Sequence, residues 1–167
     1  MNGEKYMIIT GYQGIGKSTL AKKRADVIDL ESSCFWKTEN GERTKPSDWY
    51  VYYCQMAEHL SKQGYIVFVS CHQEVREWLA ANGTEKFYAI FPGKSIKEDW
   101  LNRLYARYQA SLSRKDLTAY ERAEKCYDED INELMLECSP EVEWYSEAVR
   151  INNIRYDLEA IIAQLEN

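Results

Sequence analysis

The chain has 167 residues, a length that suits one domain with a substantial core over residues 1–167. Its formal net charge of −6 argues against broad nucleic-acid binding, so we expect no nucleic-acid partner. The apolar runs are too short to cross a membrane, and the chain enters a strand almost at once without a signal-peptide core, so we expect no membrane partner and a cytoplasmic location.

The first predicted strand covers Tyr6–Thr10, and a helix follows from Thr19 to Ala25. Between them, GYQGIGKS fits the phosphate-binding P-loop pattern G-x-x-x-x-G-K-S at residues 11–18. Its glycines allow a tight loop whose backbone N–H groups point inward at phosphate. Lys17 would reach the β- and γ-phosphates of ATP, and Ser18 would ligate Mg²⁺. The candidate contacts to the nucleotide are Gly11, Gly14, Ile15, Gly16, Lys17, Ser18 and Thr19.

A brief second strand is predicted over Asp26–Asp29, and a polar loop follows over residues 30–45. The carboxylate of Asp29 comes where a parallel strand delivers its ligand-binding residues. It could hold Mg²⁺ through water or accept the proton of an attacking hydroxyl, so we treat it as both a catalytic and a metal-site candidate. The alternative is an aspartate that only turns or caps the chain.

The rest of the chain alternates between helix and strand. The expected elements are a helix from Ser47 or Asp48 to about Gln63, a strand at Tyr65–Ser70, a helix at about Gln73–Ala81, a strand at Lys86–Phe91, a long helix starting at the capping box Ser95-x-x-Glu98, another from Thr118-x-x-Glu121 to near Ser139, a strand at Ala148–Ile151 and a helix at 153–166. Repeated βα units of this length predict an α/β fold with a five-stranded parallel sheet and helices on both faces.

Candidate acceptor-binding residues come mainly from a region of about residues 30–60. They are Asp29, Glu31, Ser32, Trp36, Lys37, Tyr53 and, after the strand at Tyr65–Ser70, His72. Trp36 or Tyr53 could stack on a flat ring, although helical aromatic residues are more often part of the core. Lys37 could contact an anion of the acceptor. His72 could bind a phosphate or a base, or it could cap the next helix.

Arg103 and Arg107 are four residues apart and should share one face of a helix in a lid over about residues 93–125. Two guanidinium groups closing on a transferring phosphoryl group would stabilise its charge, which makes both arginines catalytic candidates. The alternative is a solvated basic face.

The five cysteines have no paired spacing, so we expect free thiols, several of them buried.

The pattern Gly11-x-x-Gly14-x-Gly16-Lys17-Ser18, the carboxylate after the second strand and the arginines after the fourth resemble the small P-loop kinases of the nucleoside monophosphate kinase group. The segment from Val67 to Arg76 is similar to one in the deoxynucleoside monophosphate kinases of bacteriophages. The resemblance implies the three-layer P-loop NTPase fold, and it places the strand ending at Asp29 beside the first strand. The chain departs from the group at Ser70-Cys71-His72, where an aspartate is usual, and Asp29 would substitute for it as in shikimate and gluconate kinases.

The sequence thus predicts an Mg²⁺-ATP-dependent kinase of a nucleoside or deoxynucleoside monophosphate, acting as a monomer or homodimer. Two alternatives remain open. One is a kinase of a non-nucleotide metabolite or a polynucleotide end, and the other is a nucleotide-binding regulator without enzymatic activity.

Overall fold

The computed structural model describes residues 6–83 and 87–167. Its centre is a sheet of five parallel strands in the order β2-β5-β1-β6-β7. The strands are β1 (Met7–Gly11), β2 (Val27–Asp29), β5 (Ile66–Val69), β6 (Phe87–Pro92) and β7 (Glu147–Ile151). The prediction of a five-stranded parallel sheet is confirmed. Lys86, the first residue expected in the fourth strand, lies outside the described residues.

The middle strands are buried along their whole length, which is why their sequences are nearly continuous apolar runs. Successive residues of β1 enter opposite cores. Ile9 packs in one apolar cluster and Ile8 in the other, and the neighbouring β5 divides Phe68 and Val67 in the same way. This period of two fixes the register of the sheet, because a one-residue slip would exchange the two faces.

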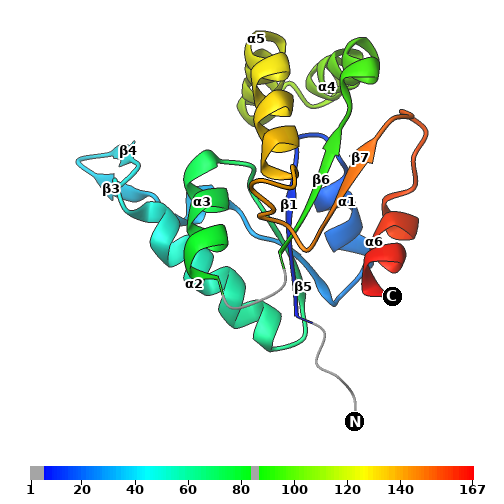
Figure 1. Ribbon diagram of the computed structural model, residues 1–167. Coiled ribbons are helices and arrows are strands. Elements are labelled where there is room, and N and C mark those ends of the chain that lie inside the picture. Colours follow the sequence, from blue (N-terminus) through cyan, green and yellow to red (C-terminus); the bar gives the residue numbers. More distant parts are fainter. Residues whose placement is uncertain (1–5, 84–86) are drawn as a thin grey trace.

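Helices cover both faces of the sheet, giving three layers (Figure 1). On one side are α2 (Trp49–Lys62) and α3 (Gln73–Asn82), and on the other are α1 (Lys17–Lys23) and α6 (Leu158–Glu166). The closing helix was expected from residue 153, but it begins at Leu158 because the Asp157 side chain accepts hydrogen bonds from the Glu159 and Ala160 N–H groups.

Two long helices, α4 (Lys97–Ser111) and α5 (Arg114–Glu137), pack side by side and extend beyond the carboxyl edge of the sheet (Figure 1). Both predicted starts were wrong. Ser95 lies in a short 3-10 turn, Lys94–Ile96, and makes no side-chain cap. The second helix begins four residues before Thr118, because Leu112 takes a left-handed conformation that ends α4 and Ser113 caps α5.

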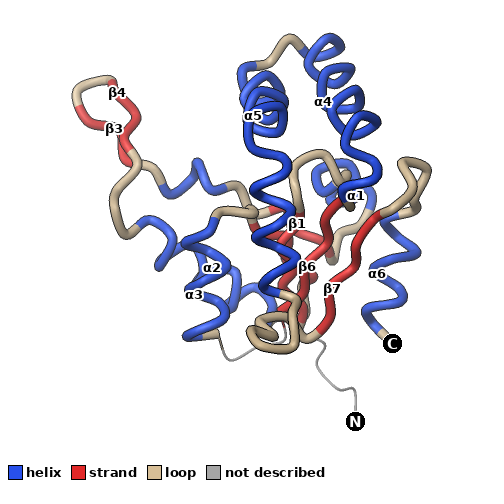
Figure 2. Tube along the Cα trace, turned by 45° about the horizontal axis from the view of Figure 1, so that its top comes forward, coloured by secondary structure: helices blue, strands red, loops and turns tan. Residues whose placement is uncertain are grey.

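The polar loop after β2 contains structure that was not predicted. A 3-10 turn, Ser32–Phe35, is followed by an antiparallel hairpin of β3 (Lys37–Glu39) and β4 (Glu42–Thr44). The hairpin turns at Asn40-Gly41, where both residues have positive φ. This dipeptide is the usual signal for such a turn. The hairpin extends away from the body of the molecule (Figure 1, Figure 2).

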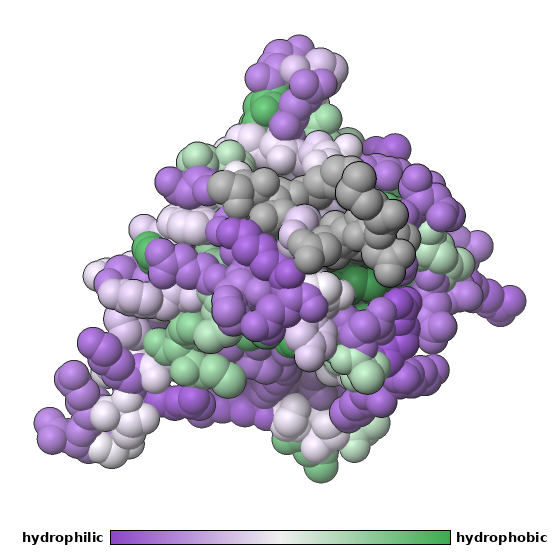
Figure 3. Space-filling view, turned by 90° about the horizontal axis from the view of Figure 1, so that it is seen from below, coloured by the Kyte–Doolittle hydropathy of each residue, from purple (hydrophilic) through white to green (hydrophobic). Residues whose placement is uncertain are grey.

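Among the described residues, no helix is both long and apolar enough to cross a bilayer. All five cysteines are free, as expected, but only Cys54 is classed as buried. The described part of the face at the amino ends of the strands is mostly hydrophilic (Figure 3).

Candidate functional site

The Gly11–Ser18 segment joins β1 to α1 at the carboxyl edge of the sheet. Gly14 and Gly16 have φ values of 90° and 107°, which L-residues with side chains rarely adopt. A Cβ atom on Gly11 would lie 2.5 Å from Cδ1 of Ile15, so the end of that side chain would have to move to make room for it. The backbone conformation therefore calls for glycine at positions 14 and 16, and the contact with Ile15 favours it at position 11.

Lys17 lies at the start of α1, and its Nζ donates a hydrogen bond to the Gly11 carbonyl oxygen across the loop at 3.0 Å. Burial lowers the pKa of this ammonium group, while the negative charge of Asp29 acts in the opposite direction. Lys17 forms no ion pair with a described carboxylate. A partly desolvated cation whose hydrogen-bond partner is a carbonyl and not a carboxylate is well suited to bind an anion.

The outer side of the loop is held by side chains from distant segments. Trp100 Nε1 donates to the Gln13 carbonyl oxygen at 2.9 Å, and Arg103 Nε donates to that of Gly14 at 3.0 Å. The Tyr156 hydroxyl donates to the next carbonyl, that of Ile15, at 2.6 Å. These contacts fix which side of the loop its carbonyl groups face.

A cavity of about 290 Å³ lies against the outer wall of the loop and the first turn of α1. It is lined in part by Gly16, Thr19, Arg103, Tyr156 and Asp157. Thr19 is exposed at its edge. The cavity combines an aromatic ring, a guanidinium group and a hydroxyl, which can bind a flat polar ring.

Asp29 ends β2, but β2 does not lie next to β1 as the resemblance implied. β5 lies between them, because Asp29 pairs in register with Phe68 of β5. Asp29 forms no ion pair among the described residues. Burial raises the pKa of its carboxyl group, and the charge of Lys17 acts to lower it. The charges of Asp29 and Lys17 therefore influence each other, although the two side chains form no ion pair.

Glu31 and Ser32 follow Asp29, and Ser32 begins the 3-10 turn. The carboxylate of Glu31 forms an ion pair with Lys115 near the start of α5, with 2.5 Å between Nζ and Oε1. This contact joins the α4–α5 pair to the region expected to bind the acceptor.

His72 follows β5, the strand between β1 and β2. Its Nδ1 is 2.8 Å from the Ser70 hydroxyl, and its ring meets the edge of Trp49 at 5.1 Å between centroids. Burial and the nearby charge of Lys45 lower the pKa of His72 to about 4. The residue stands at the N-terminus of α3 but makes no side-chain cap, so the capping alternative is not observed.

The expected stacking by Tyr53 was wrong. Its side chain is completely buried, and its hydroxyl donates to the Leu30 carbonyl and accepts from the Ser70 N–H, each at 2.7 Å. Tyr53 instead supports the segments that follow β2 and β5. Trp36 is 37% exposed beside the hairpin, and Lys37 is exposed on β3. Both side chains are therefore accessible to a ligand.

Arg103 and Arg107 lie on one face of α4, as predicted, but their partners differ. Arg103 is committed to the Gly14 carbonyl and packs on the rings of Trp100 and Tyr156, with its guanidinium carbon 5.5 and 5.3 Å from their centroids. Arg107 pairs with Asp116 of α5 at 3.3 Å and is partly exposed. Of the two, Arg107 has the more available guanidinium group.

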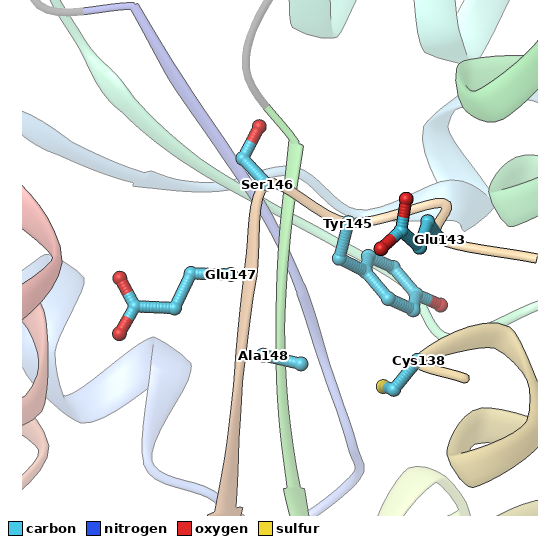
Figure 4. Close-up of a pocket in the computed structure, with 6 residues that line it drawn as sticks. All are labelled: Cys138, Glu143, Tyr145, Ser146, Glu147 and Ala148. Atoms are coloured by element: carbon cyan, nitrogen blue, oxygen red, sulfur yellow. The ribbon is translucent and has the colours of Figure 1, made fainter. Parts of the chain in front are cut away.

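A second cavity, of about 460 Å³, lies at the opposite edge of the sheet, where the chain passes from α5 into β7 (Figure 4). Its lining includes Cys138, Tyr145 and the carboxylates of Glu143 and Glu147. Carboxylates repel phosphate, and the glycine loop is at the other edge of the sheet. We therefore do not assign this cavity to the candidate site. Among the described residues, no group of three His, Cys, Asp or Glu side chains could hold a metal ion.

Comparisons with known proteins add little to this geometry. No family model and no curated protein matches the chain. A crystal structure of an uncharacterized protein from Eubacterium ventriosum ATCC 27560 is similar, with a TM-score of 0.48 and 13% identity over 98% of this chain and 96% of that one. A similarity at that level carries no argument about function.

Sequence reasoning missed Trp100, Tyr156 and Lys45. Tyr156 follows the fifth strand, and the rule that ligands gather at the carboxyl ends of parallel strands could have pointed to it. The remaining two become visible only when segments distant in the sequence are brought together.

Proposed function

We propose that the chain is an Mg²⁺- and ATP-dependent phosphotransferase that phosphorylates a nucleoside or deoxynucleoside monophosphate. In this proposal the layered sheet is the P-loop NTPase fold and the α4–α5 pair is a lid. The observation that carries the proposal is Lys17, whose ammonium group lies within a tight glycine loop and has a carbonyl, not a carboxylate, as its partner. The resemblance in sequence supports the choice of kinase.

The residues present fit a triphosphate and its metal ion. Lys17 and the free amides at the start of α1 would bind the β- and γ-phosphates. The Ser18 hydroxyl makes no hydrogen bond to a described residue and would ligate Mg²⁺. Asp29, which forms no ion pair with Lys17, would hold a water molecule of the metal. When bound, Mg²⁺-ATP supplies the phosphoryl group that is transferred.

The cavity of about 290 Å³ would receive the base of the donor. Arg103 and Tyr156 offer a cationic and an aromatic surface there, and Thr19 lies at the edge. In this proposal Arg103 contacts the base of the donor and also holds the Gly14 carbonyl of the loop. Arg107 is then the arginine of α4 that is available for the charge of the transferring group.

The acceptor would lie on the opposite side of the loop, among the residues that follow β2 and β5. Lys45 lies over the face of Trp49, 4.3 Å from its ring centroid, and the ring of His72 packs against the same ring at an angle of 76°. Lys45, an exposed cation, and the neutral His72 could bind a phosphate oxygen, and Trp36 could contact a base. These features favour a phosphorylated, aromatic acceptor.

Lys17→Ala tests the proposal. We expect the variant to fold and to lose phosphoryl transfer by at least about a hundredfold, because the cation that stabilises the transferring phosphates is removed. The matched control is Lys22→Ala, which removes an exposed lysine from the same helix and should retain full turnover. The measurement is ADP release by both variants and the wild type across a panel of monophosphates.

The same assay separates the alternatives. Turnover with a sugar, a sugar acid or a polynucleotide end, and none with monophosphates, would support the second kind of kinase. ATP binding with slow hydrolysis that no acceptor accelerates would support a regulator. Lys17→Ala turnover within tenfold of wild type would contradict the donor site itself.

A further inference from the structure

Three successive carbonyl groups of the glycine loop each accept a hydrogen bond from a side chain outside the loop. The acceptors are Gln13, Gly14 and Ile15, and the donors are Trp100, Arg103 and Tyr156. The donors are 87 to 141 residues away from their acceptors in the chain. We call these three donor residues the outer clamp.

The outer clamp determines where the loop amides point. A trans peptide is planar, so the N–H group of each residue points opposite to the carbonyl of the residue before it. Holding the Gln13 and Ile15 carbonyls outward therefore directs the Gly14 and Gly16 amides inward. Neither amide makes a hydrogen bond within the described residues, whereas the Ile15 N–H bonds to the Tyr12 carbonyl at 3.3 Å. Two donors thus remain directed into the loop.

The three side chains also hold one another. The rings of Trp100 and Tyr156 are stacked, with centroids 5.8 Å apart and planes at 21°, and Arg103 packs against both. Trp100 is completely buried. Because each donor is oriented by the other two, the clamp is arranged before any ligand binds.

Two of the donors belong to α4, which is packed directly on the loop. A Cβ atom on Gly14 would lie 2.7 Å from Cδ2 of Leu104, also on α4. The third donor, Tyr156, precedes α6. The loop is therefore held between a helix that extends over the site and a segment fixed to the body of the sheet.

We propose that the outer clamp makes the phosphate affinity of the loop depend on the position of α4. When α4 is seated, the Trp100 bond to the Gln13 carbonyl directs the Gly14 amide at phosphate, beside the Gly16 amide that Tyr156 already orients. When α4 moves away, two of the three carbonyls are released and the loop loses this shape. By linkage, a phosphate bound in the loop stabilises the seated position of α4 to the same extent. The inference rests on the proposed function only in taking phosphate as the ligand.

Tyr156→Phe and Trp100→Phe test the clamp, because each removes one donor and keeps an aromatic ring. Tyr105→Phe is the control, since it removes an exposed tyrosine hydroxyl from α4 outside the clamp. The probe is inorganic tripolyphosphate, which has no base and does not depend on stacking. We expect each clamp variant to weaken its binding about two- to tenfold by calorimetry, while Tyr105→Phe stays within about twofold.

A second measurement is independent of any ligand. In the free protein, the NMR signals of the Gly14 and Gly16 amides should shift or broaden in both clamp variants and stay unchanged in Tyr105→Phe. A merely structural effect would lower thermal stability without this local change. Tyr156 is only half-buried, so Tyr156→Phe gives a result even if Trp100→Phe fails to fold.

The outcomes separate the clamp from the proposed function. Unchanged tripolyphosphate affinity in folded Tyr156→Phe would overturn the clamp and leave the kinase proposal standing. If the wild type binds no tripolyphosphate, the proposed function fails, and the amide signals alone decide the clamp. Signals that do not change in Tyr156→Phe would then overturn it as well.

Discussion

At the scale of single residues, His72 shows how its surroundings change the chemistry of one side chain. The imidazole contacts the Ser70 hydroxyl and the edge of Trp49, and it lies near the charge of Lys45. Burial and this charge disfavour the protonated ring and lower its pKa to about 4. At neutral pH, His72 is therefore an uncharged hydrogen-bonding group and not a second cation.

This shift predicts how stability depends on pH. His72 titrates near pH 6.5 in the unfolded chain and near pH 4 in the folded protein, so between these values the unfolded state binds more protons. The free energy of unfolding should therefore fall as the pH is lowered from 6.5 to 4. His72→Asn should make that dependence shallower, as measured by urea unfolding at stepped pH. His59→Asn is the control for removing an imidazole, and an unchanged pH dependence in His72→Asn would disprove the assignment.

At the scale of secondary-structure elements, a buried ion pair joins α3 to the end of α5. Arg76 and Glu137 have side chains only 4% and 6% exposed, and Arg76 donates to both carboxylate oxygens, at 2.8 and 2.9 Å. Arg76 also donates to the Cys71 carbonyl, and the Tyr145 hydroxyl bonds to Glu137. The pair thus supports the segment after β5 from behind.

Removing Arg76 should be costly, because the Glu137 carboxylate would remain buried without its cation, whereas Arg76 has a second carboxylate partner in Glu133 at 3.1 Å. We expect Arg76→Met to lower the free energy of unfolding by about 3–5 kcal/mol. The double variant Arg76→Met/Glu137→Met should lose less than the sum of the two single variants. Arg122→Met, which breaks the exposed pair with Asp130 on α5, should cost about 1 kcal/mol or less. Additive losses in denaturant unfolding would show that the two residues are not coupled.

The elements predicted best from the sequence are those fixed by local signals. The buried strands around Ile9 and Phe68 are continuous apolar runs, and α2 ends close to the predicted Gln63, just before Gly64 with its φ of 93°. The helix starts at Ser95 and Thr118 failed because a capping pattern does not say which of several serines or threonines is used. The boundary between α4 and α5 is set by the left-handed conformation of Leu112, which its residue type does not predict.

At the scale of the whole molecule, the candidate site is predictable only where it is contiguous in the sequence. The glycine loop was found from eight successive residues, and two of its glycines, Gly14 and Gly16, have the positive φ that favours glycine. The clamp residues Trp100 and Tyr156 could not be found in that way, because the packing of α4 and of the segment before α6 brings them to the loop. Tyr53 was misassigned for the same reason, since its burial depends on strands elsewhere in the chain.

The same long-range packing brings Lys115 of α5 to Glu31. The ion pair joins α5 to the segment that follows β2, beside the candidate site. Their side chains are 67% and 42% exposed, so the pair contributes about 1 kcal/mol or less to global stability. Its effect should instead be on the orientation of the α4–α5 pair relative to the residues after β2. Local opening of an exposed contact of this kind is measurable as amide hydrogen exchange.

Lys115→Ala should therefore separate local opening from global stability. We expect Tm to change by no more than about 2–4 °C, while amide exchange speeds up around residues 112–118 and stays unchanged in β1. Lys125→Ala, at an exposed position on the same helix, should leave both unchanged. A non-hydrolysable ATP analogue together with a monophosphate acceptor should slow exchange in α4 and in the first turns of α5, because ligands that bind the closed arrangement shift the population toward it. Equal exchange in Lys115→Ala and the wild type would mean that the ion pair does not hold the helices in place, and exchange that ligands do not slow would contradict the lid.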